Sequence, residues 1–404
     1  MSITSINNSF NLFARLFESR KATEPIIKWR SEKPLLTDEP VSSPLPRALP
    51  EETGIPSGVI ADFLTDLKND PTLDMHTVLF VKNGAVIASA EFGEHSMGIP
   101  KYVFSASKSV TALAIGMLID DGKLSMNEKL VDIFGDLTNT ISKLRLRDVT
   151  VETLLTMRSC SIFNEVSSMT TPDWQSEFMK SLTRGTVNTD FNYNSLNTYM
   201  LAAIVSRKTG KGLVEYLTPR LFEPLDIKNI YWEKSPEGIE KGGWGLYIRP
   251  EDFAKIGLMV QNGGTWNGKR LISSVWLEQA VSPHATPPAE CGDFNYGYQI
   301  WTGRRANTFL FNGMLGQNLL CFRSSGLIIV SNAGNDESFQ QSNYFRYALK
   351  HFGKPFSTSL QPDSAAVSRL ESVIRDIKDP HFPCRNRKTA SAFPPFRTQT
   401  ADSA

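Results

Sequence analysis

The sequence has few of the residues that build metal centres and disulfide frameworks. Its 404 residues include five histidines and four cysteines, and neither a CxxC pair nor an H-E-x-x-H arrangement occurs. The cysteines are too widely spaced to suggest a disulfide framework, at Cys160, Cys291, Cys321 and Cys384. We therefore expect neither a metal nor another cofactor, so the chemistry must come from ordinary side chains.

An excess of charge of one sign is also absent. Lys and Arg number 43 against 42 Asp and Glu, for a net charge of +1, so the chain offers no basic field to nucleic acid. No apolar run reaches the roughly 18 to 20 residues that a membrane span requires. The N-terminus lacks an apolar stretch followed by a small-residue cleavage site. We expect a cytoplasmic protein whose partner is a small molecule; the sequence does not indicate an oligomeric state.

Length and composition favour one large domain with two extensions. Hydrophobic residues make up 41% and charged residues 21% of the chain, as in ordinary globular proteins. Residues 1–50 are predicted to be irregular because prolines cluster before position 51. Residues 356–404, rich in Pro, Ser, Thr and Arg, are predicted to be a disordered tail. Residues 51–355 then form the domain, and about 123–210 reads as a helical, loop-rich block.

The pattern inside this domain predicts a sheet surrounded by helices, an α/β (α+β) fold. An apolar hairpin is predicted at 76–92, around the turn Lys82-Asn83-Gly84. Four late strands are expected to join it in one antiparallel sheet, at 296–301, 308–311, 318–322 and 327–331. The apolar periodicity also predicts helices at 57–67, 250–260 and 343–350.

The stretch from Phe104 to Ser109 opens an apolar run that ends at Gly122. Ser105 and Lys108 are three residues apart, so a helix that begins here places them one turn apart on the same face. A serine hydroxyl at a helix N-terminus lies beside free backbone N–H groups and the positive end of the helix dipole. An amine one turn away can take its proton, which makes the pair a candidate nucleophile and base.

A purely structural interpretation of this pair is equally available. Ser105 can be an N-cap and Lys108 a solvated side chain. The helix is nevertheless too apolar to be exposed, and a lysine buried at its head needs a partner or a function. The pair therefore has to be judged with the rest of the chain.

Two later segments carry candidates for the remainder of a site. In the polar, turn-rich loop from Phe191 to Thr198, Tyr193 and Ser195 can present both hydroxyls to one point, although a packed tyrosine is the simpler interpretation. In the segment from Asn312 to Gln317, the glycines permit the close backbone approach with which a strand edge supplies an N–H to an oxyanion. A plain hairpin turn explains the same glycines.

Two further groups of side chains have both a functional and an ordinary interpretation. Glu165 and Asp173 lie on a loop that can bind a substrate amine, but a solvated surface is the simpler prediction. Five aromatic residues can line an apolar pocket, although a place in the core is more usual for them: Trp174, Trp244, Tyr247, Tyr298 and Trp301.

Taken together, the three segments resemble the serine hydrolases related to class C β-lactamases, DD-peptidases and family VIII esterases. These proteins share the order Ser-x-x-Lys, then Tyr-x-Ser or Tyr-x-Asn, then a glycine-bearing strand. Two stretches are similar to the 6-aminohexanoate-dimer hydrolase branch, namely Tyr193-Asn194-Ser195-Leu196-Asn197-Thr198 and Gly313-Met314-Leu315-Gly316-Gln317-Asn318-Leu319. Further matches extend the resemblance over roughly residues 53 to 350.

The resemblance implies a β-lactamase-like antiparallel sheet flanked by helices, an all-helical subdomain, and a site in the cleft between them. It implies that Ser105 is the nucleophile, Lys108 its close partner, and Tyr193 the general base and then acid. The activity implied is hydrolysis of small esters or linear amides through an acyl-enzyme. Because burial depresses the pKa of Lys108 while its ammonium favours a Tyr193 phenolate, the two should titrate jointly. Our hypothesis is that Tyr193, assisted by Lys108, accepts the serine proton.

The resemblance also implies supporting roles. Ser195 is expected to orient Lys108 or the substrate, and the backbone N–H groups of Ser105 and Met314 to form the oxyanion hole, with Gly313 beside the substrate. The family's Lys-Thr-Gly motif is missing, and Cys160 stands where relatives often have glycine. Without that cation, β-lactam recognition is disfavoured. A penicillin-recognising peptidase or weak β-lactamase, and a non-catalytic ligand-binding protein, remain the alternatives.

Overall fold

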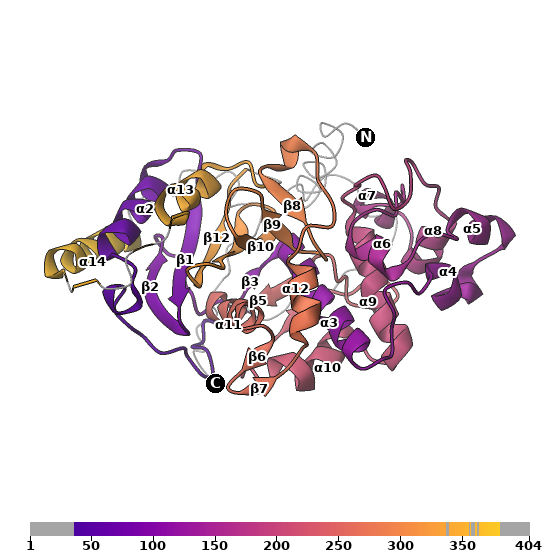
Figure 1. Ribbon diagram of the computed structural model, residues 1–404, viewed down its shortest axis with the longest axis horizontal. Coiled ribbons are helices and arrows are strands. Elements are labelled where there is room, and N and C mark those ends of the chain that lie inside the picture. The colour runs from indigo at the N-terminus through magenta and orange to yellow at the C-terminus, as the bar shows by residue number, and fades with distance from the viewer. Residues whose placement is uncertain (1–35, 337–338, 355, 357–359, 362, 380–404) are drawn as a thin grey trace, which may run out of the picture.

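The computed structural model describes residues 36–336, 339–354, 356, 360–361 and 363–379. Its centre is a seven-stranded sheet with all neighbours antiparallel, in the order β2-β1-β12-β11-β10-β9-β8. The strands are β1 (Met75–Lys82), β2 (Ala85–Glu91), β8 (Phe294–Tyr296), β9 (Trp301–Gly303), β10 (Thr308–Gly313), β11 (Gln317–Phe322) and β12 (Leu327–Ala333). The predicted antiparallel sheet flanked by helices is confirmed (Figure 1).

Helices cover both faces of this sheet. On one face Phe63 packs edge-on against Phe80 of β1, and the helices there are α2 (Ser57–Asn69), α13 (Asn343–Phe352) and α14 (Ser364–Lys378). On the other face Phe253 contacts Phe311 of β10, and the helices are α3 (Ser107–Asp120) and α11 (Pro250–Gln261). Because both faces are covered, β10, β11 and β12 are buried at every residue and lack the alternation of a half-exposed strand.

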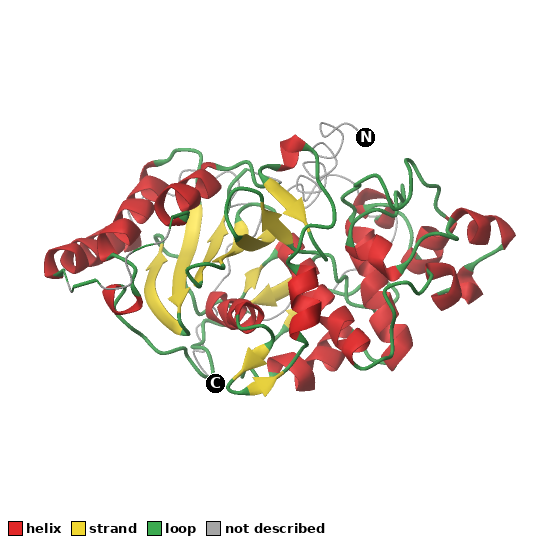
Figure 2. Cartoon of the chain, in the orientation of Figure 1, coloured by secondary structure: helices red, strands yellow, loops and turns green. Residues whose placement is uncertain are grey.

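Residues 123–210 form a block of helices and loops beside the sheet, and this whole described stretch contains no strand (Figure 2). α9 packs along α3, so the block continues the apolar core of the α3 and α11 side. The helices of the block are α4 (Leu130–Ile133), α5 (Thr140–Arg145), α6 (Val151–Leu155), α7 (Glu165–Ser168), α8 (Trp174–Lys180) and α9 (Ser195–Thr209).

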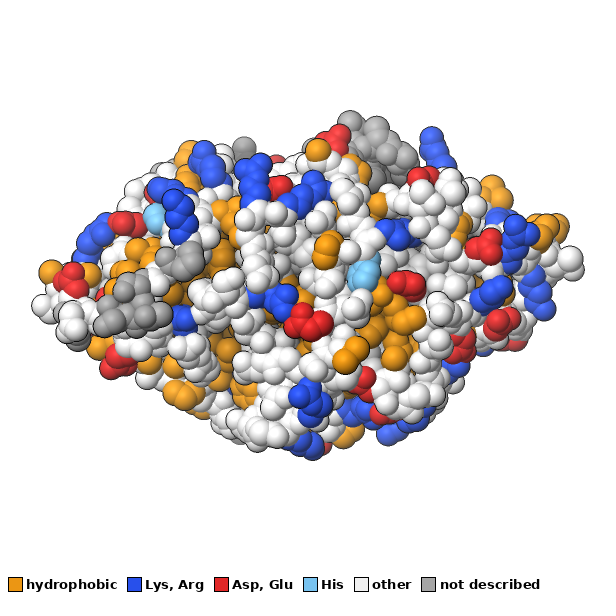
Figure 3. Space-filling view, viewed as in Figure 1, with side chains coloured by type: hydrophobic (Ala, Val, Ile, Leu, Met, Phe, Trp, Pro, Cys, Tyr) orange, Lys and Arg blue, Asp and Glu red, His pale blue; other side chains and the backbone are white. Residues whose placement is uncertain are grey.

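Smaller elements connect the block to the sheet. A three-stranded sheet has the order β3-β5-β4, and its pairing of Lys101 with Ile248 fixes the chain just before Ser105. The other strands and α-helices are β3 (Lys101–Tyr102), β4 (Tyr231–Trp232), β5 (Leu246–Ile248), β6 (Thr265–Trp266), β7 (Lys269–Arg270), α10 (Leu213–Leu217) and α12 (Ser274–Ala280). Basic and acidic side chains are interspersed over the face seen in Figure 3, in keeping with the balanced composition.

The strand predicted at 296–301 is wrong. The chain reverses inside this range, and Tyr296 of β8 and Trp301 of β9 lie opposite each other in a hairpin. A tight turn closes it, with the Gly297 N–H donating to the Ile300 carbonyl over 2.8 Å and Gln299 at a φ of 61°. An apolar run with one glycine conceals such a turn, because tyrosine, isoleucine and tryptophan all favour strands.

The predicted disordered tail at 356–404 is also wrong in part. Residues 364–378 form α14, whose N-terminus is capped by the Asp363 side chain. The helix buries Leu370 and Ile377 against α2 and the edge strand β2. Its polar composition suggested disorder because only one narrow face is apolar. Residues 380–404, and residues 1–35 of the predicted N-terminal extension, lie outside the described residues, whereas residues 36–50 are irregular apart from one bridge between Arg47 and Val86.

Candidate active site

Ser105 lies in a short 3₁₀ turn, η2 (Phe104–Ala106), that leads directly into α3. The helix was expected to begin at Ser105, but its first α-helical residue is Ser107. Phe104 has a φ of 46°, an uncommon left-handed conformation for a bulky residue. The abrupt turn leaves Ser105 partly exposed while the residues on either side of it are buried.

Lys108 is buried in the first turn of α3, with 1% of its surface exposed. Its Nζ lies 2.9 Å from Ser105 Oγ, 2.8 Å from Ser195 Oγ and 2.8 Å from the Gly243 carbonyl oxygen. These acceptors match the three N–H bonds of an ammonium, and a neutral amine in the same place turns its lone pair toward one of the hydroxyls. The interpretation of Lys108 as a solvated side chain is therefore wrong.

The environment of Lys108 brings its pKa close to neutral pH. Burial lowers its pKa to about 7, and the carboxylate of Glu165 opposes that effect. The Gly243 contact depends on glycine, because a Cβ built there would lie 2.6 Å from the Ser195 carbonyl oxygen. The backbone of this loop thus comes close enough to α9 for its carbonyl to reach the amine.

Tyr193 comes from the loop before α9 and meets Ser105 through a hydrogen bond between the two side chains. Its ring is stacked on Trp301 with centroids 5.7 Å apart, and Lys108 Nζ lies 4.8 Å from the ring centroid. Burial raises the pKa of Tyr193 well above that of a free phenol, whereas the hydrogen bond with Ser105 lowers it. The phenol is therefore held both in position and in its protonated form.

Ser195 is the first residue of α9, so the predicted loop from Phe191 to Thr198 in fact ends at Asn194. The Asn194 side chain accepts a hydrogen bond from the Leu196 N–H over 2.9 Å, as an N-cap does. Its amide also donates to the carbonyl oxygens of Ser161 and Phe163, at 3.1 and 2.8 Å. These hydrogen bonds of the Asn194 side chain fix the start of α9, where Ser195 contacts Lys108.

Glu165 is a residue that the sequence interpretation assigned to the solvated surface, and this is wrong. It opens α7, is half-buried, and its Oε1 accepts a hydrogen bond from the Ser195 N–H over 2.8 Å. The contact joins residues 30 positions apart, with α7, α8 and their loops between them, so no periodic signal could reveal it. Asp173, paired with Glu165 in that interpretation, is exposed as predicted, and it caps α8 through the Ser176 N–H.

The glycine-bearing segment forms the end of β10. Gly313 is its last residue, and a Cβ there would lie 2.2 Å from the Val103 carbonyl oxygen, so glycine allows this strand to approach the chain next to Ser105. Met314 follows and is buried, with 6% exposed. Asn312, on the strand before them, donates to Asn318 Oδ1 and accepts from Gln340 Nε2, at 2.8 and 3.1 Å.

The aromatic residues divide as the ordinary interpretation predicts, with one exception. Trp174, Trp244 and Tyr298 are buried in the core, and Tyr247 is half-buried. Trp301 is buried as well, but it contacts the site because it supports the Tyr193 ring.

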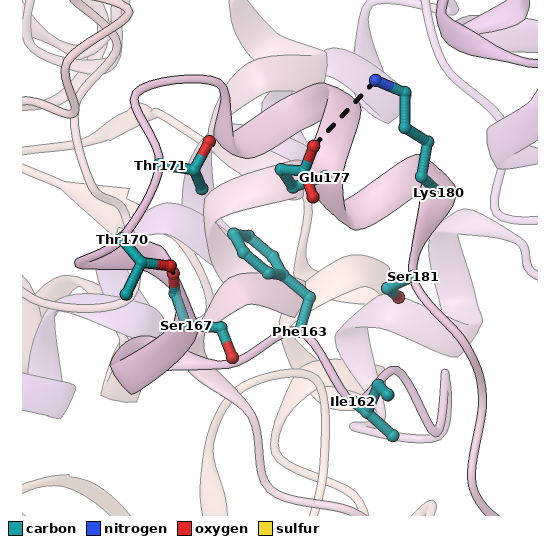
Figure 4. Close-up of a pocket in the computed structure, with 8 residues that line it drawn as sticks. All are labelled: Ile162, Phe163, Ser167, Thr170, Thr171, Glu177, Lys180 and Ser181. Atoms are coloured by element: carbon teal, nitrogen blue, oxygen red, sulfur yellow. Dashed lines mark hydrogen bonds and ion pairs between the residues drawn. The ribbon is translucent and has the colours of Figure 1, made fainter.

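A separate cavity of about 310 Å³ lies in the helical block between α7 and α8 (Figure 4). Glu177 and Lys180 form an ion pair of 3.9 Å on one side of it, opposite Thr170 and Ser167. None of the lining residues is one of the predicted site residues. Within the described residues, no group of three His, Cys, Asp or Glu side chains is arranged to hold a metal ion, and no helix is long and apolar enough to cross a membrane.

The chain is similar to known proteins both in sequence and in fold. The beta-lactamase family model matches residues 47–345. A 6-aminohexanoate-dimer hydrolase of Paenarthrobacter ureafaciens is 28% identical over 248 residues, which are 54% of this chain and 62% of the relative. The chain thus matches less than two thirds of that relative's length.

Two solved structures show the same fold at low identity. A Bacillus anthracis protein assigned as a 6-aminohexanoate-dimer hydrolase superposes with a TM-score of 0.62 and 18% identity, covering 85% of this chain and 91% of that one. The D-amino acid amidase of Ochrobactrum anthropi superposes with a TM-score of 0.54 and 15% identity, covering 79% of this chain and 98% of that one.

Proposed function

This chain belongs to the beta-lactamase family, and from that premise we propose that it is a serine hydrolase that forms an acyl-enzyme on Ser105. One observation carries the proposal: the amine of buried Lys108 lies 2.9 Å from the Ser105 hydroxyl, which also bonds with Tyr193. A serine is a weak nucleophile until a neighbouring base accepts its proton. A lysine whose pKa is about 7 supplies such a base at neutral pH.

In the proposed reaction the Ser105 proton passes to the Lys108 and Tyr193 pair as Oγ attacks the substrate carbonyl. The tetrahedral oxyanion is bound by the backbone N–H groups of Ser105 and Met314, next to Gly313. The pair then gives the proton to the leaving alcohol or amine, which departs as the acyl-enzyme forms. Water repeats the sequence, and the acid product and free serine result.

The direction of the two pKa shifts favours Lys108 as the group that is unprotonated at rest. The pKa of Lys108 is lowered to about 7, while that of Tyr193 is raised by burial. This modifies our hypothesis that Tyr193 itself accepts the serine proton, since a phenol with a raised pKa serves better as a relay and as the donor to the leaving group. Ser195 then holds the amine in line with Ser105.

Small esters and linear amides are the proposed substrates. The names of the relatives point to amide bonds, in a 6-aminohexanoate dimer and in D-amino acid amides. A β-lactamase or penicillin-recognising peptidase is the second candidate, favoured by the family match. Uncharged residues, either those at 311–313 or those at 314–316, stand in the region of the family's lysine, which leaves a β-lactam carboxylate without a cation there.

The test combines a covalent probe with a panel of substrates. Wild-type protein should gain the mass of one fluorophosphonate adduct, and Ser105→Ala should gain none; labelling of that variant at the wild-type rate contradicts the proposal. A panel of p-nitrophenyl esters and linear amides, followed by intact mass spectrometry, identifies the acyl group, and nitrocefin tests the second candidate. Failure to label and to hydrolyse any of them supports a ligand-binding protein instead.

A further inference from the structure

Glu165 lies behind the proposed catalytic pair. Its Oε1 accepts the Ser195 N–H over 2.8 Å, and the hydroxyl of the same Ser195 lies 2.8 Å from Lys108 Nζ. A single residue at the start of α9 therefore separates the carboxylate from the amine. The negative charge also lies at the positive end of the α9 dipole, where it is stabilised.

The charged and titratable groups that face Lys108 are few. From η2, just before its own helix, it meets the Ser105 hydroxyl, from α9 the Ser195 hydroxyl, and from the loop before α9 the Tyr193 phenol. Among the described residues, Glu165 is the only charged side chain found to act on Lys108 electrostatically. It acts on Tyr193 too, together with the thiol of Cys291 in the turn before β8.

We propose that Glu165 is a positioning residue that sets where the proton rests in the Lys108 and Tyr193 pair, an inference that rests on the proposed function. As Ser105 loses its proton, positive charge forms on Lys108, and the fixed carboxylate behind Ser195 stabilises it. The hydrogen bond from the Ser195 N–H holds the carboxylate in place. One side chain therefore both anchors the N-terminus of α9 and supplies the negative charge that stabilises the Lys108 ammonium.

The sign of the effect follows from the charge. Glu165 favours the ammonium of Lys108 and disfavours the Tyr193 phenolate, so it raises the pKa of both groups. Without the charge, the pair gives up its proton at lower pH and is also a weaker base. Reaction of Ser105 should then begin at lower pH but reach a lower plateau.

The variant Glu165→Gln tests this, because an amide oxygen still accepts the Ser195 N–H and only the charge is lost. The rate of fluorophosphonate labelling of Ser105 is measured from about pH 5 to 9, and we expect the midpoint to fall by about half a unit or more, with a plateau two- to threefold lower. Glu165→Asp keeps the charge and should return the midpoint toward that of the wild type.

Glu237→Gln is the matched control. Glu237 likewise accepts a backbone N–H at a helix N-terminus, that of Trp174 over 2.9 Å, but it is not among the groups that act on Lys108 or Tyr193. Its midpoint should equal that of the wild type. Equal midpoints in wild type and Glu165→Gln, with melting temperatures unchanged, overturn the proposal and leave Glu165 a helix cap.

A second measurement separates this inference from the proposed function. The Lys108 pKa is read directly from the shift of its ¹³Cε signal, assigned by its loss in Lys108→Met, without any need for a reactive serine. A lower pKa in Glu165→Gln supports the role of Glu165 even if the wild type is never labelled. An unchanged pKa refutes it even if labelling succeeds.

Discussion

The burial of Lys108 is not explained by a role in stabilising the fold. Removing an ammonium from water is costly, and most lysines avoid the cost by reaching the surface. Lys108 stays inside, between Ser105, Ser195 and the Gly243 carbonyl, and burial lowers its pKa to about 7. A side chain with this geometry is better suited to exchange a proton than to stabilise the fold.

This argument predicts the behaviour of Lys108→Met. Methionine fills a similar volume without charge, so the relief from burying an amine offsets the hydrogen bonds lost, and the free energy of unfolding should change by less than about 1 kcal/mol. Labelling of Ser105 and ester turnover should fall about a thousandfold. Urea denaturation and kcat/KM measure the two effects. A variant that loses stability but keeps activity would show that Lys108 is structural.

For single residues, the sequence reveals contacts between positions close together in the chain and misses those between positions far apart. Ser105 and Lys108 are one helical turn apart, so their spacing made them candidates, and the apolar helix that follows favoured the pair. Glu165 reaches Ser195 across 30 positions of the chain, and two segments this far apart come together only in the folded structure. Cys160 occupies a left-handed conformation with a φ of 55°, which explains why glycine suits that position in relatives, yet nothing in the neighbouring residues predicts that φ.

Among the elements, α3 is buried on almost every side and therefore depends on close packing. Gly116 lies where α3 meets α12, and a Cβ built there would be 2.2 Å from Nε1 of Trp276. Trp276 is itself buried and stacked on Tyr298 with ring centroids 5.3 Å apart. The indole thus has little freedom to move away from an added methyl group.

We therefore expect Gly116→Ala to destabilise the protein, although alanine is the better helix former. The overlap with Trp276 should cost about 1 to 3 kcal/mol. Gly58→Ala in α2 is the matched control, because its Cβ would lie 3.9 Å from that of Ala366, an ordinary contact. That variant should gain about 0.5 to 1 kcal/mol. Thermal and urea unfolding measure both; equal effects of the two substitutions would contradict the packing argument.

Elements with a strong local pattern were predictable, and those defined by partners were not. The hairpin β1–β2 follows from its apolar runs and turn residues, and the helices α2, α11 and α13 follow from apolar periodicity. β8 and β9 merge into one apparent strand because the reversal between them lacks a turn signature. α14 is mostly polar, and its two buried residues, Leu370 and Ile377, matter only once α2 and β2 are present to cover them.

For the whole molecule, the candidate site lies where three parts of the chain meet. η2 and α3 supply Ser105 and Lys108, the helical block supplies Tyr193 and Ser195, and Met314 follows directly after β10 of the sheet. Two apolar cores lie on opposite sides of the sheet, and one of them extends into the helical block. Family resemblance foretold this arrangement; the periodicity of a single sequence could not, since it carries no information on which distant segments converge.

A pair of stacked histidines is a further titratable feature of the molecule. Away from the site, His76 of β1 is stacked on His95 with ring centroids 3.8 Å apart. Burial lowers the pKa of His76 well below its usual value and that of His95 to about 4, and nearby Lys101 adds to both shifts. Lys378 at the end of α14 donates to the His95 carbonyl oxygen over 3.1 Å, so this cluster joins α14 to the sheet.

The histidine pair predicts that the fold weakens in mild acid. The unfolded chain takes up protons below about pH 6.5, whereas folded His95 refuses one until about pH 4. The contribution of His95 to the free energy of unfolding is therefore fully present above pH 6.5. It is lost as the pH falls toward 4, which lowers this free energy by about 3 kcal/mol. Urea unfolding at pH 8 and pH 4.5 measures the loss. In His95→Gln, the free energy of unfolding at pH 8 gives the cost of the lost stacking. The difference in this free energy between pH 8 and pH 4.5 should be smaller than in the wild type. A difference as large as in the wild type would mean that His95 does not cause the acid sensitivity.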